Sequence, residues 1–163
     1  MTTIRFAALF AAAVAAAAMS VTDAQAQTAT QSVSYEVSAI NEISVSGSPS
    51  LVINDATPGS GLVSASAAGT YAITSNQTNR KITARIDTNM PANVTLSVQL
   101  AAPTNATSAG SVNLTSVDQD VVTGISNVDQ SGLSISYGLS ATVAAGVVAA
   151  GNKTVTYTIT AGA

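Results

Sequence analysis

Apolar and polar residues alternate along much of the chain, in short runs that are rich in Val, Ile and Thr. In one such run the apolar residues Val33, Tyr35 and Val37 alternate with Ser34 and Glu36. Successive side chains of a β-strand point to opposite faces of its sheet, so this period of two predicts strands with one apolar face. We expect such strands at residues 32–39, 42–46, 70–75, 81–87, 93–100, 111–116, 132–140 and 154–160, and a shorter, more continuously apolar one at 50–54.

Turn-forming residues separate these runs. Gly, Pro, Asn, Asp and Ser cluster at residues 46–49, 55–61, 75–79, 89–93, 102–110, 129–132 and 149–152, where they favour turns and loops. Residues 71–86 are interpreted as one hairpin, and residues 141–151 as an irregular strand with its connection. About eight to ten short antiparallel strands at this spacing predict an all-β fold, and the expected architecture is a single immunoglobulin-like, Greek-key β-sandwich.

The first 26 residues have the features of a signal peptide. Arg5 precedes an alanine-rich apolar stretch from Phe6 to Ala18, and residues 24–26 form a small-x-small cleavage site that ends at Ala26. The chain is therefore divided into a signal peptide, residues 1–26, and a β-sandwich domain, residues 27–163. The apolar stretch is too short to span a bilayer of about 30 Å, so no membrane span is expected after cleavage. The pattern is that of bacterial Sec-type export, which predicts a secreted or cell-surface protein, or a periplasmic one.

Charge and cysteine content narrow the classes of function. Only 8% of the residues are charged, against about 25% in ordinary soluble domains, and the net charge is −3. This balance argues against nucleic acid or an anionic membrane as a partner. A polar surface with so little charge does little to oppose association, and low charge with high β-propensity is typical of chains that assemble. Cysteine is absent, so packing and hydrogen bonds alone must hold the domain.

The residue types that most catalytic sites need are missing. The sequence contains neither histidine nor cysteine, which excludes Ser-His-Asp and Cys-His machinery, zinc sites with nitrogen or sulfur ligands, haem and iron–sulfur clusters. Carboxylate pairs and Ser–Lys dyads remain. The chain has no tryptophan to stack on a sugar, however, and Lys81 and Lys153 are expected to face outward from their strands. We expect a protein that is not an enzyme and that uses no cofactor.

Asp118 and Asp120 lie two residues apart, ahead of Gly124, and alternate acids in a loop can supply oxygen ligands to calcium. Asp129 is the carboxylate nearest in the sequence that could add a third ligand. No glutamate closes the loop as it does in an EF-hand, and calcium takes about six to eight oxygen ligands. A polar turn between two strands is therefore the favoured interpretation, with a calcium site as the alternative.

Arg80, Lys81 and Arg85 form a basic cluster within six positions of the chain. Such a cluster could bind an acidic glycan or the acidic patch of a protein partner. Charged residues on an edge hairpin also prevent the hairpin from pairing with another sheet. We favour this protective role, and ligand binding is the alternative.

The last strand has two different faces. Residues 154–160 place four threonines on one side and Val155, Tyr157 and Ile159 on the other. β-branched polar residues fit the pleat of a solvated sheet face, so the threonine face is expected to meet solvent and the apolar face the core.

At the other end, the polar residues 27–31 lead into the run that contains Val33, Tyr35 and Val37. A terminal strand of this kind can complete the sheet of a neighbouring subunit. Its main-chain hydrogen bonds then give affinity, and its alternating apolar side chains fill pockets.

In overall style, residues 27–163 resemble secreted bacterial pilin-like and fimbrial subunits, and also uncharacterised surface β-sandwich proteins. The shared features are a cleaved signal, one sandwich domain, strands rich in Thr, Ser and Asn, few charges and no catalytic residues. The resemblance implies a non-catalytic structural protein that assembles with copies of itself or with other surface proteins by β-strand addition, through Val33, Tyr35 and Val37. The disulfide common in chaperone–usher pilins is missing, which puts that route of assembly in doubt. The alternative is a monomeric extracellular module that binds a carbohydrate or a surface partner through loops such as residues 75–81 and 116–120.

Overall fold

The computed structural model describes residues 27–162, so the predicted signal peptide, residues 1–26, lies outside the described residues. By its internal contacts the chain divides into two units, with the boundary between Glu36 and Val37. Residues 27–36, the described part of the first unit, form neither helix nor strand and are exposed. Within the described range, no helix is long and apolar enough to cross a membrane.

The second unit is built from β-strands. In chain order they are β1 (Asn41–Ser46), β2 (Ala56–Thr57), β3 (Gly61–Leu62), β4 (Ala65–Ser75), β5 (Arg80–Ile86), β6 (Val94–Leu100), β7 (Thr107–Ser108), β8 (Val112–Asn113), β9 (Gln119–Ile125), β10 (Val128–Ala141) and β11 (Val155–Ala161). A short 3-10 helix, η1 (Val143–Ala145), follows β10, and the described residues contain no α-helix. The all-β prediction is therefore confirmed.

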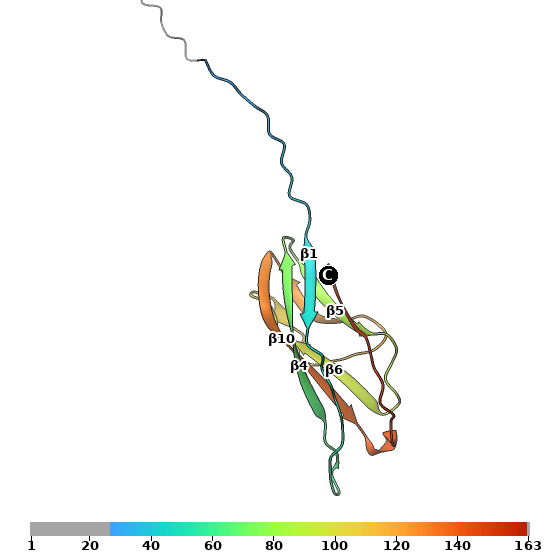
Figure 1. Ribbon diagram of the computed structural model, residues 1–163. Coiled ribbons are helices and arrows are strands. Elements are labelled where there is room, and N and C mark those ends of the chain that lie inside the picture. Colours follow the sequence, from blue (N-terminus) through green and yellow to red (C-terminus); the bar gives the residue numbers. More distant parts are fainter. Residues whose placement is uncertain (1–26, 163) are drawn as a thin grey trace, which may run out of the picture. The chain divides into compact units, whose positions relative to one another are not determined.

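Two antiparallel sheets contain most of these strands (Figure 1). The first sheet has the order β1-β4-β10-β6-β8, the second has the order β11-β5-β9-β7, and β2 and β3 form a separate small hairpin. One hydrophobic core takes side chains from both large sheets. This arrangement is consistent with a β-sandwich, in which each sheet buries one face against the other.

The core follows the alternation along the central strands. In β4, Tyr71 and Ile73 are buried, whereas Thr70 before them and Thr74 after them are exposed. The second sheet adds the buried residues Ile82, Ala84 and Ile86 of β5 and Val121, Val122 and Ile125 of β9. Each large aliphatic side chain buried in this way stabilises the fold by about 1.5–3 kcal/mol. The two facing rows therefore hold the sheets together without any disulfide.

The predicted hairpin at residues 71–86 is wrong in its pairing. β4 pairs with β1 and β10 in the first sheet, whereas β5 pairs with β9 and β11 in the second. The link between β4 and β5 turns a corner from one sheet to the other, and within it Asn79 adopts a left-handed conformation (φ 50°), which asparagine tolerates. Ile73 and Ile82 on either side of the corner then enter the same core. Alternation shows which face of a strand is buried, but it does not show which sheet the strand joins.

Several strands also differ from the prediction in their extent. Residues 32–39 and 50–54 form no strand, and β1 begins at Asn41. The expected strand at 111–116 is reduced to the two residues of β8. β4 and β10 are longer than expected, and β10 contains a register shift between Gln130 and Leu133. Residues 141–151, expected to form an irregular strand with its connection, contain no strand beyond Ala141, where β10 ends, and the short helix η1 follows.

Small residues in the first half of β4 allow the end of β1 to lie close to it. Ala65, Ala67 and Gly69 continue the inward row of Tyr71. A methyl group at position 69 would lie 3.0 Å from the Ser46 carbonyl oxygen and 3.6 Å from the Tyr137 ring. Because Gly69 has no side chain, the end of β1 can pack against β4 without a clash.

Replacing Gly69→Ala is expected to destabilise the fold by about 1–3 kcal/mol, the usual cost of forcing a group into a packed interior. The new methyl group would press on the Ser46 carbonyl oxygen, a backbone atom that cannot rotate away. Gly151→Ala is the matched control, because nothing lies within 4 Å of its added methyl group. Urea unfolding of both variants measures the difference, and wild-type stability in the Gly69 variant would contradict the close approach.

Candidate assembly site

Three large apolar side chains ahead of β1 are exposed to solvent. Val33 is 75% exposed, Tyr35 94% and Val37 81%. Isolated exposed apolar residues are normal on a protein surface. Here they recur at every second position, so an extended backbone aligns them as one apolar stripe. We call residues 31–40 the leading segment, and its three stripe residues are those that the sequence predicts for assembly.

Asn76, in the corner between β4 and β5, ties the end of the leading segment to the folded unit. Its Oδ1 accepts a hydrogen bond from the Ile40 N–H (2.8 Å), and its Nδ2 donates one to the Ser38 carbonyl oxygen (2.8 Å). Its backbone N–H donates to the Ile40 carbonyl oxygen (3.3 Å), which continues the β1–β4 register beyond the Asn41–Ser75 pair. Residues 38–40 are thereby held in line with β1.

β1 and β11 are the outer strands on one side of the two sheets. They contact each other, and Figure 1 shows the red strand β11 approaching β1 near the point where β1 begins. A hydrogen bond from the Gly162 N–H to the Asn79 carbonyl oxygen (2.7 Å) holds the end of β11 at the corner that also contains Asn76. Edge strands present unpaired backbone groups, so a further strand can pair on this side of the structure.

The inner faces of these two edge strands are incompletely covered. Val155, Tyr157 and Ile159 of β11 lie opposite buried residues of β5, yet all three remain only half-buried. On β1, Ile43 is half-buried and Val45 is 52% exposed. Among the described residues, nothing covers this apolar margin to the extent that the central strands are covered.

A tyrosine pair anchors the margin across the two sheets. The Tyr157 hydroxyl donates a hydrogen bond to the Tyr137 hydroxyl of β10 (2.9 Å). Burial, with a further contribution from this hydrogen bond, raises the pKa of Tyr157 far above its ordinary value. Burial also raises the pKa of Tyr71 to about 12, and the Tyr71 hydroxyl donates to the Ala101 carbonyl oxygen. Tyr157 and Tyr71 are neutral at physiological pH, so they act here as packing and hydrogen-bonding groups.

Acidic and basic residues that the sequence assigned to separate sites pair with each other on the outer face of the second sheet. Lys81 Nζ lies 2.9 Å from Asp120 Oδ1, and Arg85 Nε lies 3.8 Å from Asp118 Oδ1. The β5–β9 register, which sets Thr83 opposite Asp120, brings these side chains together. Exposed pairs of this kind contribute roughly 0–1 kcal/mol, so their main effect is to neutralise the surface.

The remaining members of the two predicted sites lie elsewhere. Asp129 is in β10 of the first sheet, away from the β9 strand that contains Asp120. Within the described residues no three metal-ligating side chains come together, so the structure does not assemble the carboxylates of the calcium hypothesis. Arg80 begins β5, and its Nε is buried without a hydrogen-bond partner. Binding of a glycan or acidic partner by Arg80, Lys81 and Arg85 stays a prediction.

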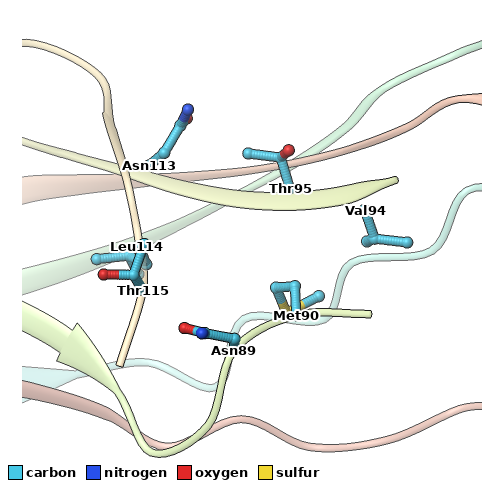
Figure 2. A pocket seen from close by; sticks show the side chains of 7 residues that line it. All are labelled: Asn89, Met90, Val94, Thr95, Asn113, Leu114 and Thr115. Atoms are coloured by element: carbon cyan, nitrogen blue, oxygen red, sulfur yellow. The ribbon is translucent and has the colours of Figure 1, made fainter. Parts of the chain in front are cut away.

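A shallow hollow is lined by none of these residues (Figure 2). It is lined by Asn89, Met90, Val94, Thr95, Asn113, Leu114 and Thr115. Figure 2 shows the side chains of Thr95 and Asn113 standing on the same side of β6. The Asn89 side chain accepts a hydrogen bond from the Ser116 N–H (2.7 Å), and the Asn89 carbonyl oxygen accepts one from Lys153 Nζ (3.1 Å). These polar groups hold neighbouring loops together, and none of the lining residues is charged.

Sequence reasoning misses two features of the assembly site. It places residues 32–39 in a regular strand, although the structure leaves them unpaired and their apolar side chains exposed. It also gives no role to Asn76, which is one of several asparagines in predicted turns. The faces of β11 are predicted correctly for the apolar row, but nothing in its sequence shows that it is an edge strand.

Comparisons with known proteins do not provide a relative from which a function could be transferred. The chain matches no protein-family model, no curated protein and no solved structure.

Proposed function

We propose that this protein is a non-catalytic structural subunit, secreted or displayed at the cell surface, that assembles by β-strand addition in the manner of pilin-like proteins. The observation that carries the proposal is the exposed stripe of Val33, Tyr35 and Val37 directly ahead of an edge strand. In strand addition, an extended segment pairs with the edge of another sheet and its alternate side chains enter the apolar face. This chain supplies both the segment and an incompletely covered margin between β1 and β11.

The free energy gained by burying the stripe is comparable in size to the cost of association. Removing one apolar side chain of this size from water contributes about 1.5–3 kcal/mol, so the three together contribute roughly 5–9 kcal/mol. Each hydrogen bond of a new ladder adds about 0.5–1.5 kcal/mol. The opposing cost of association is about 4–15 kcal/mol. The two sides are similar in size, so the stripe decides whether assembly is favourable.

The surface charge supports assembly rather than ligand binding. Only 8% of the residues are charged, and the pairs Lys81–Asp120 and Arg85–Asp118 neutralise four of them. A surface with so few unpaired charges does not repel a second copy. Because Lys81 and Arg85 already have acidic partners, the alternative of a monomeric module that binds an acidic ligand has less support.

We further propose that the chain is exported and that its sandwich has immunoglobulin-like, Greek-key topology. A signal peptide at residues 1–26, cleaved after Ala26, would direct the chain to a bacterial Sec-type route and so to the periplasm, the cell surface or the medium. An immunoglobulin-like Greek key is supported by the run from β4 to β11, in which each strand lies in the other large sheet from the strand before it. The position of β10 between β4 and β6 in the first sheet supports the same topology.

Replacing the stripe by serine, Val33→Ser, Tyr35→Ser and Val37→Ser together, is expected to abolish assembly. The substitution removes roughly 5–9 kcal/mol of burial from the assembled state. The side chains are exposed before assembly, so the stability of the single subunit should be unchanged. Size-exclusion chromatography with light scattering, and negative-stain electron microscopy, would show monomers in place of oligomers or filaments.

The matched control places two substitutions on the opposite side of the same segment, Ser32→Thr and Ser34→Thr. These keep the backbone length and the β-propensity without touching the stripe, so assembly should be retained. Oligomers formed equally well by the serine variant and the control would rule out the stripe as the assembly element. A wild-type chain that stays monomeric across the accessible concentration range would remove the proposed function itself.

A tryptophan at position 35 should report assembly directly, because the chain has no tryptophan of its own. Tyr35 is almost fully exposed, and strand addition would move its side chain into an apolar face. The emission of Tyr35→Trp is therefore expected to shift to the blue as the concentration is raised. Val147→Trp is the control at a fully exposed position outside the segment, and its emission should stay constant. Emission from position 35 that does not change while oligomers form would contradict burial of the stripe.

A further inference from the structure

The strand that accepts the leading segment can be identified among the sheet edges. Within the described residues, the outer strands are β1 and β8 in the first sheet and β11 and β7 in the second. β7 and β8 have two residues each, too few to pair along a stripe that runs from Val33 to Val37. β1 has six residues and β11 has seven, so either is long enough.

The inner row of β11 fits the stripe better than the inner row of β1. In β11 this row is apolar throughout and only half-buried: Val155, Tyr157 and Ile159. In β1 the row begins with Asn41, which accepts a hydrogen bond from the Ser75 hydroxyl (2.8 Å) and donates one to Gln77 Oε1 (3.4 Å). A strand added at β1 would set an apolar side chain beside this polar group, whereas at β11 every inner neighbour is apolar.

The outer rows favour the same edge. Glu36 falls on the side of the leading segment opposite to the stripe. On β1 the outer row contains the exposed carboxylate of Glu42, and like charges on adjacent strands repel. On β11 the outer row is neutral and consists of Thr156, Thr158 and Thr160. Addition at β11 therefore avoids a repulsion that addition at β1 would create.

Asn76 determines whether the leading segment can add to β11 of its own chain or only to β11 of a second copy. The start of β1 and the end of β11 meet at the corner that contains Asn76 and Asn79. To lie along its own β11, the leading segment would have to reverse its direction at residues 38–40. The hydrogen bonds of Asn76 to Ser38 and Ile40 hold these residues in line with β1, so the reversal would break them.

We infer that the leading segment of one copy adds to the free edge of β11 in a second copy, and that Asn76 prevents the segment from closing onto β11 of its own chain. The inference rests on the proposed function and names the acceptor and the partner, a second copy of this chain. Donor and acceptor are different surfaces, so each bound copy still offers a free acceptor or donor. Such a contact is heterologous and generates an open, head-to-tail row of subunits.

Disulfide trapping tests the acceptor, because the chain has no cysteine of its own. The donor chain has Ser34→Cys, on the side away from the stripe. Acceptor chains contain one cysteine in the outer row of β11, at Thr156, Thr158 or Thr160, or one in the outer row of β1, at Glu42, Ser44 or Ser46. The acceptor chains also have the serine-substituted stripe, so they cannot donate. Only residues directly opposite each other form the bond, since the Cα atoms must lie about 4.4–6.8 Å apart.

A disulfide-linked dimer with a β11 cysteine, and none with a β1 cysteine, is the expected result. Linkage to β1 cysteines would overturn the acceptor. If neither edge is linked while the wild-type chain still forms oligomers, β11 is not the acceptor, and the subunits must assemble through another surface. Wild-type chains that form no oligomers would overturn the proposed function and, with it, the inference.

The substitution Asn76→Ala tests whether this residue directs the leading segment away from its own β11. It is made in full chains that contain both Ser34→Cys and the β11 cysteine that gave linkage. With Asn76 present, oxidation should yield linked oligomers. In the alanine variant the product should shift towards a monomer with an internal disulfide. Asn76→Asp is the matched variant, because it keeps the acceptor for the Ile40 N–H but has no donor for the Ser38 carbonyl oxygen, and its shift should be smaller. Thermal unfolding confirms that each variant is folded, and intermolecular products alone from a folded alanine variant would overturn the role of Asn76.

Discussion

The structure depends on one interaction, the burial of one row of apolar side chains from each of two sheets in a shared core. No disulfide contributes, and the two ion pairs described above lie on the outer face, where they add little. The central strands are covered on the inner face by the opposite sheet, so residues such as Ile73 and Ile82 are fully buried. At the margin formed by β1 and β11 the same rows continue with less cover. At this margin the apolar rows are thus only partly buried, and an added strand could bury them further.

How much of the fold can be predicted follows from what alternation encodes. The period of two identifies strands, and it places Val155, Tyr157 and Ile159 on the inner face of β11, as observed. It says nothing about the partner of a strand, because any sheet offers the same ladder of backbone groups. For this reason the link between β4 and β5 is predicted as a hairpin, although it is a corner between sheets. The Lys81–Asp120 pair depends in the same way on a register that sequence spacing cannot reveal.

The candidate site shows a related limit. The pattern of Val33, Tyr35 and Val37 is that of a core strand, and alternation indicates only that the row is suited to burial. Whether the burial occurs within the chain or against another copy depends on where the segment lies relative to the completed sheets. Its position ahead of the first strand suggests donation, but the residue that constrains it, Asn76, is distant in sequence and common in type. Polar side chains that bond to the backbone in this way are hard to recognise without coordinates, because turn asparagines are frequent for local reasons.

For a chain that assembles by strand addition, such a constraint matters more than the strength of the contacts. The β11 edge of the same chain and that of a second copy offer identical side chains, so contact energy cannot distinguish them. A segment joined by a short flexible link is present at its own edge at an effective concentration of about millimolar. At lower protein concentrations the intramolecular contact would therefore prevail and no assembly would form. Hydrogen bonds that hold residues 38–40 in line with β1 remove this competition by geometry. To do so, the free energy of these hydrogen bonds has to exceed the free energy gained when the segment pairs with β11 of its own chain. The hydrogen bonds do not involve β11, so in the proposed assembly its edge stays available to the next subunit.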